Sequence, residues 1–186
     1  VAAPGRFALA GAGLGGAIAI EMLRRAPERV TRIALISTTP LADTPEQSAA
    51  RETQVVKAQA GQLLEARNLM CGAECLAPGE MRDKVLSLLD KMAIGMGAQS
   101  FVRQLRAMQR RPDGQKVLMT NRAPALVIAG GQDKIAPVKR QSFMAELIPY
   151  ARFEMIAEAG HYPTLETPKK VNAVLRSWMA QPLVLR

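Results

Sequence analysis

The sequence has few of the residues that metal sites and nucleic-acid sites use. Of its 186 residues one is histidine, two are cysteine and 4% are aromatic. Structural zinc sites take four cysteine or histidine ligands, so Cys71, Cys75 and a single histidine make a poor set, and we expect no metal. Free thiols are the simpler interpretation of the cysteine pair, and a local disulfide stays open. The shortage of aromatic side chains, on which unpaired bases stack, argues against a nucleic-acid partner.

The sequence also lacks any segment that would cross a membrane or direct export. No apolar run approaches the roughly 20 residues that a membrane-spanning helix needs. Residues 1–5, Val-Ala-Ala-Pro-Gly, show neither the charged start nor the apolar stretch of a signal peptide. We therefore expect a cytoplasmic protein with no membrane partner. The net charge of +9 is spread along the chain, which predicts a solvated basic surface rather than a nucleic-acid site.

What is present is the composition of one globular domain, 48% hydrophobic and 22% charged. Short apolar runs predict four strands, at residues 6–10, 32–37, 125–129 and 152–156. Segments of good helix formers follow the first, third and fourth of these runs, at residues 17–26, 138–148 and 168–179. This alternation predicts an α/β fold with a mainly parallel sheet and flanking helices.

Residues 41–118 interrupt the alternation with a helical block. Thr44-Pro45-Glu46-Gln47 is a capping box with proline at the first helical position, and predicts a long helix to about Arg67. A second helix is predicted to open at residues 78–80, with Met81, Val85, Leu88, Leu89 and Met92 on one side, and a third to cover residues 98–110. We therefore expect one domain overall, with a core of residues 1–40 and 119–186 and a helical cap inserted at 41–118.

A glycine-rich turn follows the first strand and opens the first helix. Gly11, Gly13 and Gly16 match the G-x-G-x-x-G spacing that lets a dinucleotide pyrophosphate approach the backbone. Gly11 and Gly15 match the outer positions of the G-x-S-x-G nucleophile elbow, with Gly13 in place of the serine. A turn with no ligand is the third interpretation. These residues alone leave the three interpretations open.

Residues further along the chain favour the elbow. A dinucleotide site needs Asp or Glu at the end of the second strand, where the chain has Ser37, Thr38 and Thr39. Asp133 follows the third strand and His161 follows the fourth. Because the carboxyl ends of parallel strands share one edge, we expect these two side chains to meet there. An acid that orients a histidine, and a histidine that takes a nucleophile's proton, are two of the three groups of a hydrolase triad.

At this point the chain is identified as a member of the α/β-hydrolase superfamily, and it is similar to the esterase and lactonase branch. Residues 124–133 with Pro137 resemble the segment that carries the family's acid, and residues 160–168 resemble the segment that carries its histidine. Residues 101–104 and 111–113 resemble the end of its cap. The resemblance implies a partial α/β-hydrolase fold of about four strands, and hydrolysis of small esters, lactones or thioesters by a nucleophile–His161–Asp133 triad. It also implies no cofactor and a small acyl-type ligand under the cap.

The first departure from the family's pattern is Gly13 at the nucleophile position. Without a hydroxyl, thiol or carboxylate there is no covalent nucleophile, although the Leu14 N–H can still supply half of an oxyanion hole. We therefore expect impaired hydrolysis. The alternative is a non-catalytic binding or interaction protein of hydrolase descent, as in the N-myc downstream-regulated family, which this chain resembles in its glycine-rich elbow. Dinucleotide binding through Gly11, Gly13 and Gly16 is a weaker alternative.

The second departure is the short stretch before the first strand. The family's sheet has several strands ahead of the elbow, so we expect an N-terminal truncation of roughly 80 to 100 residues relative to a domain of the usual size. The apolar strand at residues 6–10 would then lie at a sheet edge with unpaired backbone groups. This predicts a homodimer or a missing N-terminal partner segment.

Overall fold

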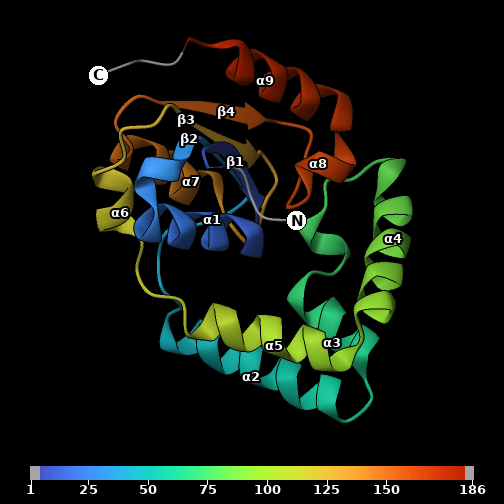
Figure 1. The fold of residues 1–186 in the computed structure, drawn as a ribbon. Coiled ribbons are helices and arrows are strands. Elements are labelled where there is room, and N and C mark those ends of the chain that lie inside the picture. The colour runs from blue at the N-terminus through green and yellow to red at the C-terminus, as the bar shows by residue number, and fades with distance from the viewer. Residues whose placement is uncertain (1–4, 183–186) are drawn as a thin grey trace.

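The structure, a computed structural model, describes residues 5–182. Within this range the chain forms a parallel sheet with the strand order β1-β2-β3-β4 (Figure 1). The strands are β1 (Phe7–Ala12), β2 (Val30–Ile36), β3 (Ala125–Gly130) and β4 (Ala151–Ile156). The predicted α/β class with a parallel sheet is confirmed. β1 extends two residues beyond its predicted end, so the turn to the first helix is confined to Gly13.

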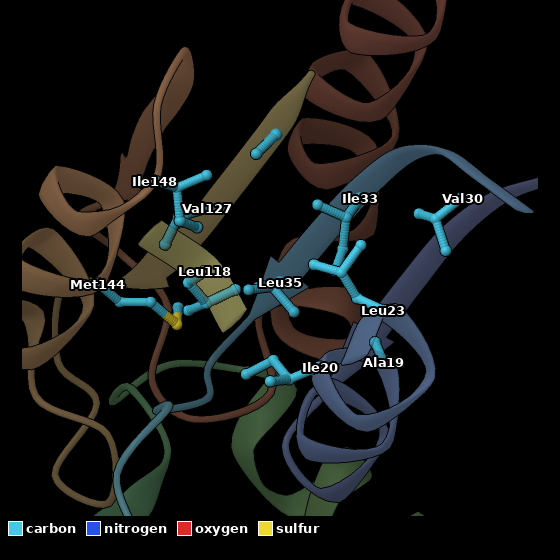
Figure 2. Packing of buried hydrophobic residues seen from close by; sticks show 11 residues of the cluster. Ala19, Ile20, Leu23, Val30, Ile33, Leu35, Leu118, Val127, Met144 and Ile148 are labelled. Carbon is cyan, nitrogen blue, oxygen red and sulfur yellow. The ribbon is translucent and has the colours of Figure 1, made fainter. Parts of the chain in front are cut away.

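Helices cover both faces of the sheet (Figure 1). One face carries α1 (Leu14–Arg25), α6 (Gln115–Met119) and α7 (Val138–Leu147), and the other carries α9 (Pro168–Ala180). Because side chains alternate along a strand, Ile33 and Leu35 of β2 face the first layer, whereas Ala34 and Ile36 face the second. Figure 2 shows the first layer, where side chains of α1, β2, β3 and α7 gather around Leu118. Burial on both faces explains the continuous apolar runs of β2 and β3.

Four of the helices between β2 and β3 lie apart from the sheet, and we call this group the cap (Figure 1). They are α2 (Pro45–Gln59), α3 (Leu63–Met70), α4 (Met81–Met96) and α5 (Ala98–Gln109). The predicted capping box is present, since Thr44 Oγ1 accepts the Gln47 N–H at 3.3 Å and Gln47 Oε1 accepts the Thr44 N–H at 3.0 Å. Phe101 and Leu105 of α5 are buried against α2 and α3. Short helical turns complete the chain: η1 (Pro27–Arg29), η2 (Ala73–Cys75) and α8 (Pro163–Glu166).

The prediction of one helix reaching Arg67 is wrong. α2 ends at Gln59, and the chain turns at Gly61, which has a φ of +82°, before α3 begins at Leu63. Glycine adopts this left-handed conformation without steric cost, and the apolar periodicity continues on both sides of the turn, so the pattern concealed the break. α6 and α8 were not predicted, because helices of five and four residues are too short to show a period.

α4 buries a narrower face than the sequence predicted. Val85 and Leu89 are buried, whereas Met81, Leu88 and Met92 are 40%, 41% and 52% exposed. α4 packs against α3, α5 and α8 along one narrow side, and Met92 faces a cavity instead of a neighbouring helix. Within the described part of the chain, none of these helices has the length and apolar character needed to cross a bilayer.

Candidate active site

The turn between β1 and α1 is sharp and is held against the end of β2. At its apex Gly13 has φ 52° and ψ −118°, a conformation that residues with side chains rarely adopt. The Gly13 N–H donates to the Ile36 carbonyl at 3.0 Å, and the Gly13 carbonyl accepts a hydrogen bond from the Thr38 hydroxyl at 2.9 Å. A residue held at positive φ between a strand and a helix is the backbone context that a nucleophile elbow requires, and glycine adopts it without strain.

Two other glycines allow the turn to close. A Cβ on Gly11 would lie 2.2 Å from the Gly15 carbonyl oxygen, and a Cβ on Gly16 would lie 2.5 Å from Thr38 Cγ2. Real Cβ atoms do not approach other atoms so closely, so Gly11 and Gly16 leave room for α1 to begin directly beside both strands. Gly15 is different, because a Cβ added there would meet no heavy atom of the described neighbours within 4 Å. The packing of the turn therefore does not require a glycine at position 15.

Asp133 and His161 meet beyond the carboxyl ends of β3 and β4, as the sequence predicted. His161 Nδ1 lies 2.9 Å from Asp133 Oδ2 and 3.0 Å from Oδ1. Asp133 Oδ1 also accepts the N–H groups of Ile135 and Ala136, at 2.9 Å each, and the Asp133 side chain is fully buried. A carboxylate fixed in this way favours the imidazole tautomer with its proton on Nδ1, which leaves Nε2 free to accept a proton.

The free edge of the His161 ring faces the elbow. A Cβ on Gly13 would lie 3.9 Å from His161 Nε2, which is the nearest atom among the described residues once Gly13 and its two neighbours in the chain are set aside. A hydroxyl one bond further along would come within hydrogen-bond reach of that nitrogen. Leu14, the first residue of α1, lines the same cavity, and N–H groups in the first turn of a helix have no partner within the helix. The structure thus brings the predicted positions together, while their catalytic roles stay predictions.

The loop that carries His161 is held by Glu166, a residue that the sequence analysis did not single out. The Glu166 carboxylate accepts the N–H groups of the residues before and after His161, at 2.9 Å each, and that of Ala77 at 2.7 Å. The N–H of His161 itself donates to the Cys75 carbonyl at 2.8 Å. The histidine loop is therefore tied to the segment between α3 and α4. No local pattern indicated this role, since a glutamate on a four-residue helix is most often solvated.

A cavity of about 370 Å³ lies between the elbow and the cap. Gly13, Leu14 and His161 line it from the sheet. The cap contributes a mainly apolar set, Met70, Met92, Met96, Phe101, Leu105 and Met108, together with the polar or charged Gln47, Arg51, Arg67 and Gln104. Its volume is within the range of small-molecule sites. Two other hollows, of about 450 and 770 Å³, include neither Gly13 nor His161. The cavity is therefore a place where a ligand can reach both Gly13 and His161.

Cys71 and Cys75 are both free and buried, and Cys71 also lines the cavity. A hydrogen bond between the two thiols raises the pKa of Cys71 and lowers that of Cys75. Burial, reinforced by the neighbouring thiols, raises the pKa of Tyr162 above its usual value. Among residues 5–182, no group of three or more His, Cys, Asp or Glu side chains is placed to hold a metal ion.

Comparisons of the sequence with known proteins find matches over most of the chain. A family model for the alpha/beta hydrolase fold matches residues 4–168. The pimeloyl-[acyl-carrier protein] methyl ester esterase of Nitrosomonas europaea is 31% identical over 183 residues, which cover 90% of this chain and 69% of that protein. A biotin biosynthesis bifunctional protein of Teredinibacter turnerae is 26% identical, over 96% of this chain and 34% of its own length.

Solved structures show the same architecture. A thermophilic esterase from Thermogutta terrifontis superimposes with a TM-score of 0.87 at 25% identity, over 94% of this chain and 65% of that one. The enol-lactonase from Burkholderia xenovorans has a TM-score of 0.83 at 20% identity, over 95% of this chain and 66% of that one, a likeness of fold alone. The chain thus spans about two thirds of the length of these structures.

Proposed function

We propose a function for this chain from the family to which it belongs, the alpha/beta hydrolase fold family. In this proposal the chain binds a small acyl compound in the capped cavity and hydrolyses it poorly or not at all. Gly13 carries the proposal, because it occupies the apex of the elbow opposite His161 Nε2 and has no side chain. The esterases among the similar proteins support an ester as the compound bound, and lactones and thioesters complete the class that the family resemblance implies.

The proposed loss of activity follows from the chemistry of the triad. In a complete triad the histidine takes the proton of the nucleophile as it attacks the carbonyl carbon, and an acyl-enzyme forms. In this proposal Asp133 and His161 keep the roles of acid and base and the Leu14 N–H that of oxyanion donor, but Gly13 has no side-chain atom that can form the acyl bond. Removal of a triad nucleophile from a comparable enzyme lowers kcat by about 10⁶-fold, leaving what binding and oxyanion stabilisation supply.

A pair of substitutions at Gly13 tests the proposal. Gly13→Ser places a hydroxyl beside His161, whereas Gly13→Ala adds the same strained Cβ at positive φ without it. We expect Gly13→Ser to hydrolyse p-nitrophenyl acetate at least about 100-fold faster than Gly13→Ala, the lower range of general-base assistance. A fluorophosphonate probe should label only the serine variant. Turnover of the unaltered chain above about 1 per second would overturn the proposal, as would a folded Gly13→Ser variant with no gain.

Dinucleotide binding is the weaker of the alternative functions. In a dinucleotide site the glycines open the turn to a pyrophosphate. Here the space beside Gly11 is filled by the Gly15 carbonyl, and the space beside Gly16 is filled by Thr38. The absent side chains thus serve contacts inside the turn, which supports the elbow interpretation.

The exposed edge of strand β1 supports a homodimer in which this strand pairs with that of a second copy of the chain. β1 ends the strand order among the described residues, and Ala8, Ala10 and Ala12 are exposed. An open edge presents unpaired N–H and C=O groups, and a two-fold symmetric pair is the commonest way to satisfy them. Light scattering at micromolar concentration should report a dimer. A monomer whose β1 amides resist hydrogen exchange would contradict this assignment.

A further inference from the structure

We infer that the capped cavity binds a small acyl compound that carries a free carboxylate in addition to its ester, lactone or thioester carbonyl, and that Arg51 and Arg111 hold this carboxylate. The inference rests on the proposed function, since it names the class of compound that the same cavity takes. It comes from the balance of charge around the cavity, which the apolar lining and the elbow do not explain.

The charged side chains that line the cavity have one sign. Among the residues that the structure describes, Arg51, Arg67 and Arg111 line it, and no Asp or Glu does. These arginine side chains are 18%, 5% and 10% exposed. A cation removed from water to this extent is costly unless an anion lies close by, so the partners of each arginine decide whether the cavity is cationic.

Arg67 is neutralised within the protein. Its guanidinium forms an ion pair with Asp90 and donates to the Cys71 carbonyl at 2.9 Å. The remaining Nε–H of Arg67 is buried and has no acceptor among the residues that the structure describes. Buried donors in native proteins almost always have a partner. Arg67 therefore offers one hydrogen bond to a ligand oxygen, but no net charge.

Arg51 and Arg111, by contrast, share a single carboxylate. Asp43 Oδ2 accepts from Arg51 Nε at 2.5 Å, and Asp43 Oδ1 lies 2.9 Å from an Arg111 terminal nitrogen. The Asp43 side chain is 1% exposed, so this group of three is enclosed. Glu52, the next residue after Arg51, pairs with Arg106 on the surface instead. Within residues 5–182, two cations and one anion therefore leave one positive charge without a counter-ion beside the cavity.

The pKa of Arg111 is consistent with an excess of positive charge beside the cavity. Burial lowers the pKa of Arg111, the Asp43 carboxylate opposes that shift, and the charge of Arg51 adds to it. Two guanidiniums that repel each other across one carboxylate are stabilised by a second anion. A ligand carboxylate supplies the missing negative charge. The donors that remain for it are on the terminal nitrogens of the two guanidiniums, because Arg51 Nε and Nη2 already contact Asp43 and Arg111 Nε donates to the Leu41 carbonyl at 2.8 Å.

The other residues that line the cavity indicate the chemistry of the rest of the ligand. Apart from these arginines and two glutamines, the cap side is formed mainly by methionine, leucine and phenylalanine side chains, which suit a short methylene chain. Gly13 and His161 line the same cavity, so a carboxylate at the arginines and a carbonyl at the elbow belong to one bound molecule. The compound is thus the monoester, or a related acyl derivative, of a dicarboxylic acid.

Binding to the unaltered chain provides the test, because it requires no turnover. Monomethyl adipate, dimethyl adipate and methyl 6-aminohexanoate differ in the charge at one end, and calorimetric titration measures the affinity of each. We expect monomethyl adipate to bind at least about tenfold more tightly than the diester, a difference of about 1.4 kcal/mol, and the amine to bind weakest. Equal affinity for the monoester and the diester would overturn the inference.

Arg51→Gln isolates the unpaired charge. This variant leaves Arg111 paired with Asp43, so it removes the excess charge without leaving a buried carboxylate alone. We expect its preference for the monoester over the diester to vanish, and Arg51→Lys to keep part of it. Arg103→Gln, at an exposed arginine of α5 outside the cavity, is the matched control and should keep the full preference.

The outcomes also separate this inference from the proposed function. A folded Arg51→Gln variant that keeps the preference would overturn the assignment to Arg51 and Arg111. Selective monoester binding by a chain whose Gly13→Ser variant gains no esterase activity would support the carboxylate site and contradict the proposed elbow chemistry. Gain of esterase activity without selective binding would contradict the carboxylate site alone.

Discussion

Gly15 and Gly16 are neighbours in the first turn of α1, yet one added methyl group should change the stability in opposite directions at the two positions. A Cβ on Gly16 would lie 2.5, 2.7 and 2.8 Å from three side-chain atoms of Thr38, whereas a Cβ on Gly15 would meet no heavy atom within 4 Å. Thr38 has little room to move, because its hydroxyl donates to the Gly13 carbonyl at 2.9 Å and the residue is buried.

The magnitudes follow from two opposing effects. Alanine is favoured over glycine inside a helix by about 0.5–1 kcal/mol, so Gly15→Ala should stabilise the fold by up to that amount. Gly16→Ala has the same advantage but forces a methyl group into occupied space, and overpacking typically costs about 1–3 kcal/mol. The two variants should therefore differ by about 1–3 kcal/mol, or roughly 2–4 °C in Tm per kcal/mol for a chain of this size.

Urea unfolding followed by tryptophan fluorescence measures the difference. Trp178 is the single tryptophan of the sequence and is buried between α9 and the sheet, far from the substituted turn in the chain. Adding Thr38→Ala to Gly16→Ala removes two of the three close atoms, so the double variant should recover part of the loss. Equal unfolding midpoints for Gly15→Ala and Gly16→Ala would refute the packing argument.

Three further predictions concern the core, the titration of Tyr162 and the acid. Leu118→Ala, at a position with no exposed surface, should cost about 2–5 kcal/mol of unfolding free energy, whereas Met119→Ala, at a position 58% exposed, should cost under about 0.5 kcal/mol. Burial raises the pKa of Tyr162 in the folded protein. The stability that the neutral phenol contributes is therefore complete below the unfolded pKa of about 10 and is lost as the pH rises above that value. Tyr162→Phe should lessen the fall in unfolding free energy that is measured as the pH is raised. In the Gly13→Ser background, Asp133→Asn should lower the restored p-nitrophenyl acetate rate by about 10⁴-fold, because asparagine holds the wrong imidazole tautomer, and a loss below tenfold would contradict that role.

Most of the fold was accessible from local sequence. The continuous apolar runs of β2 and β3 show the length and burial of these strands directly. Thr44 with Gln47 marks the start of α2 through a contact between near neighbours. The break at Gly61 was not accessible, because glycine permits a left-handed turn without requiring one. The exposure of Met92 was not accessible either, since it depends on which side of α4 finds a partner.

The candidate site, like the fold, was predictable from the sequence only in part. Gly13, Asp133 and His161 each follow a strand, and the carboxyl ends of parallel strands share one edge, so the order of elements was enough to predict that they meet. The sequence by itself also determined that no nucleophilic side chain stands at the elbow, because the residue type at position 13 does not depend on packing.

Only the tertiary structure decided the charge of the cavity. In the sequence, Arg51 and Arg111 are two of many basic residues, and nothing near either of them indicates a shared partner. Their net charge beside the cavity depends on Asp43 being enclosed between them while Glu52 turns outward to Arg106. Burial and pairing arise from contacts between segments distant in the chain, and electrostatic energies depend on both, so residue types and spacing do not determine them.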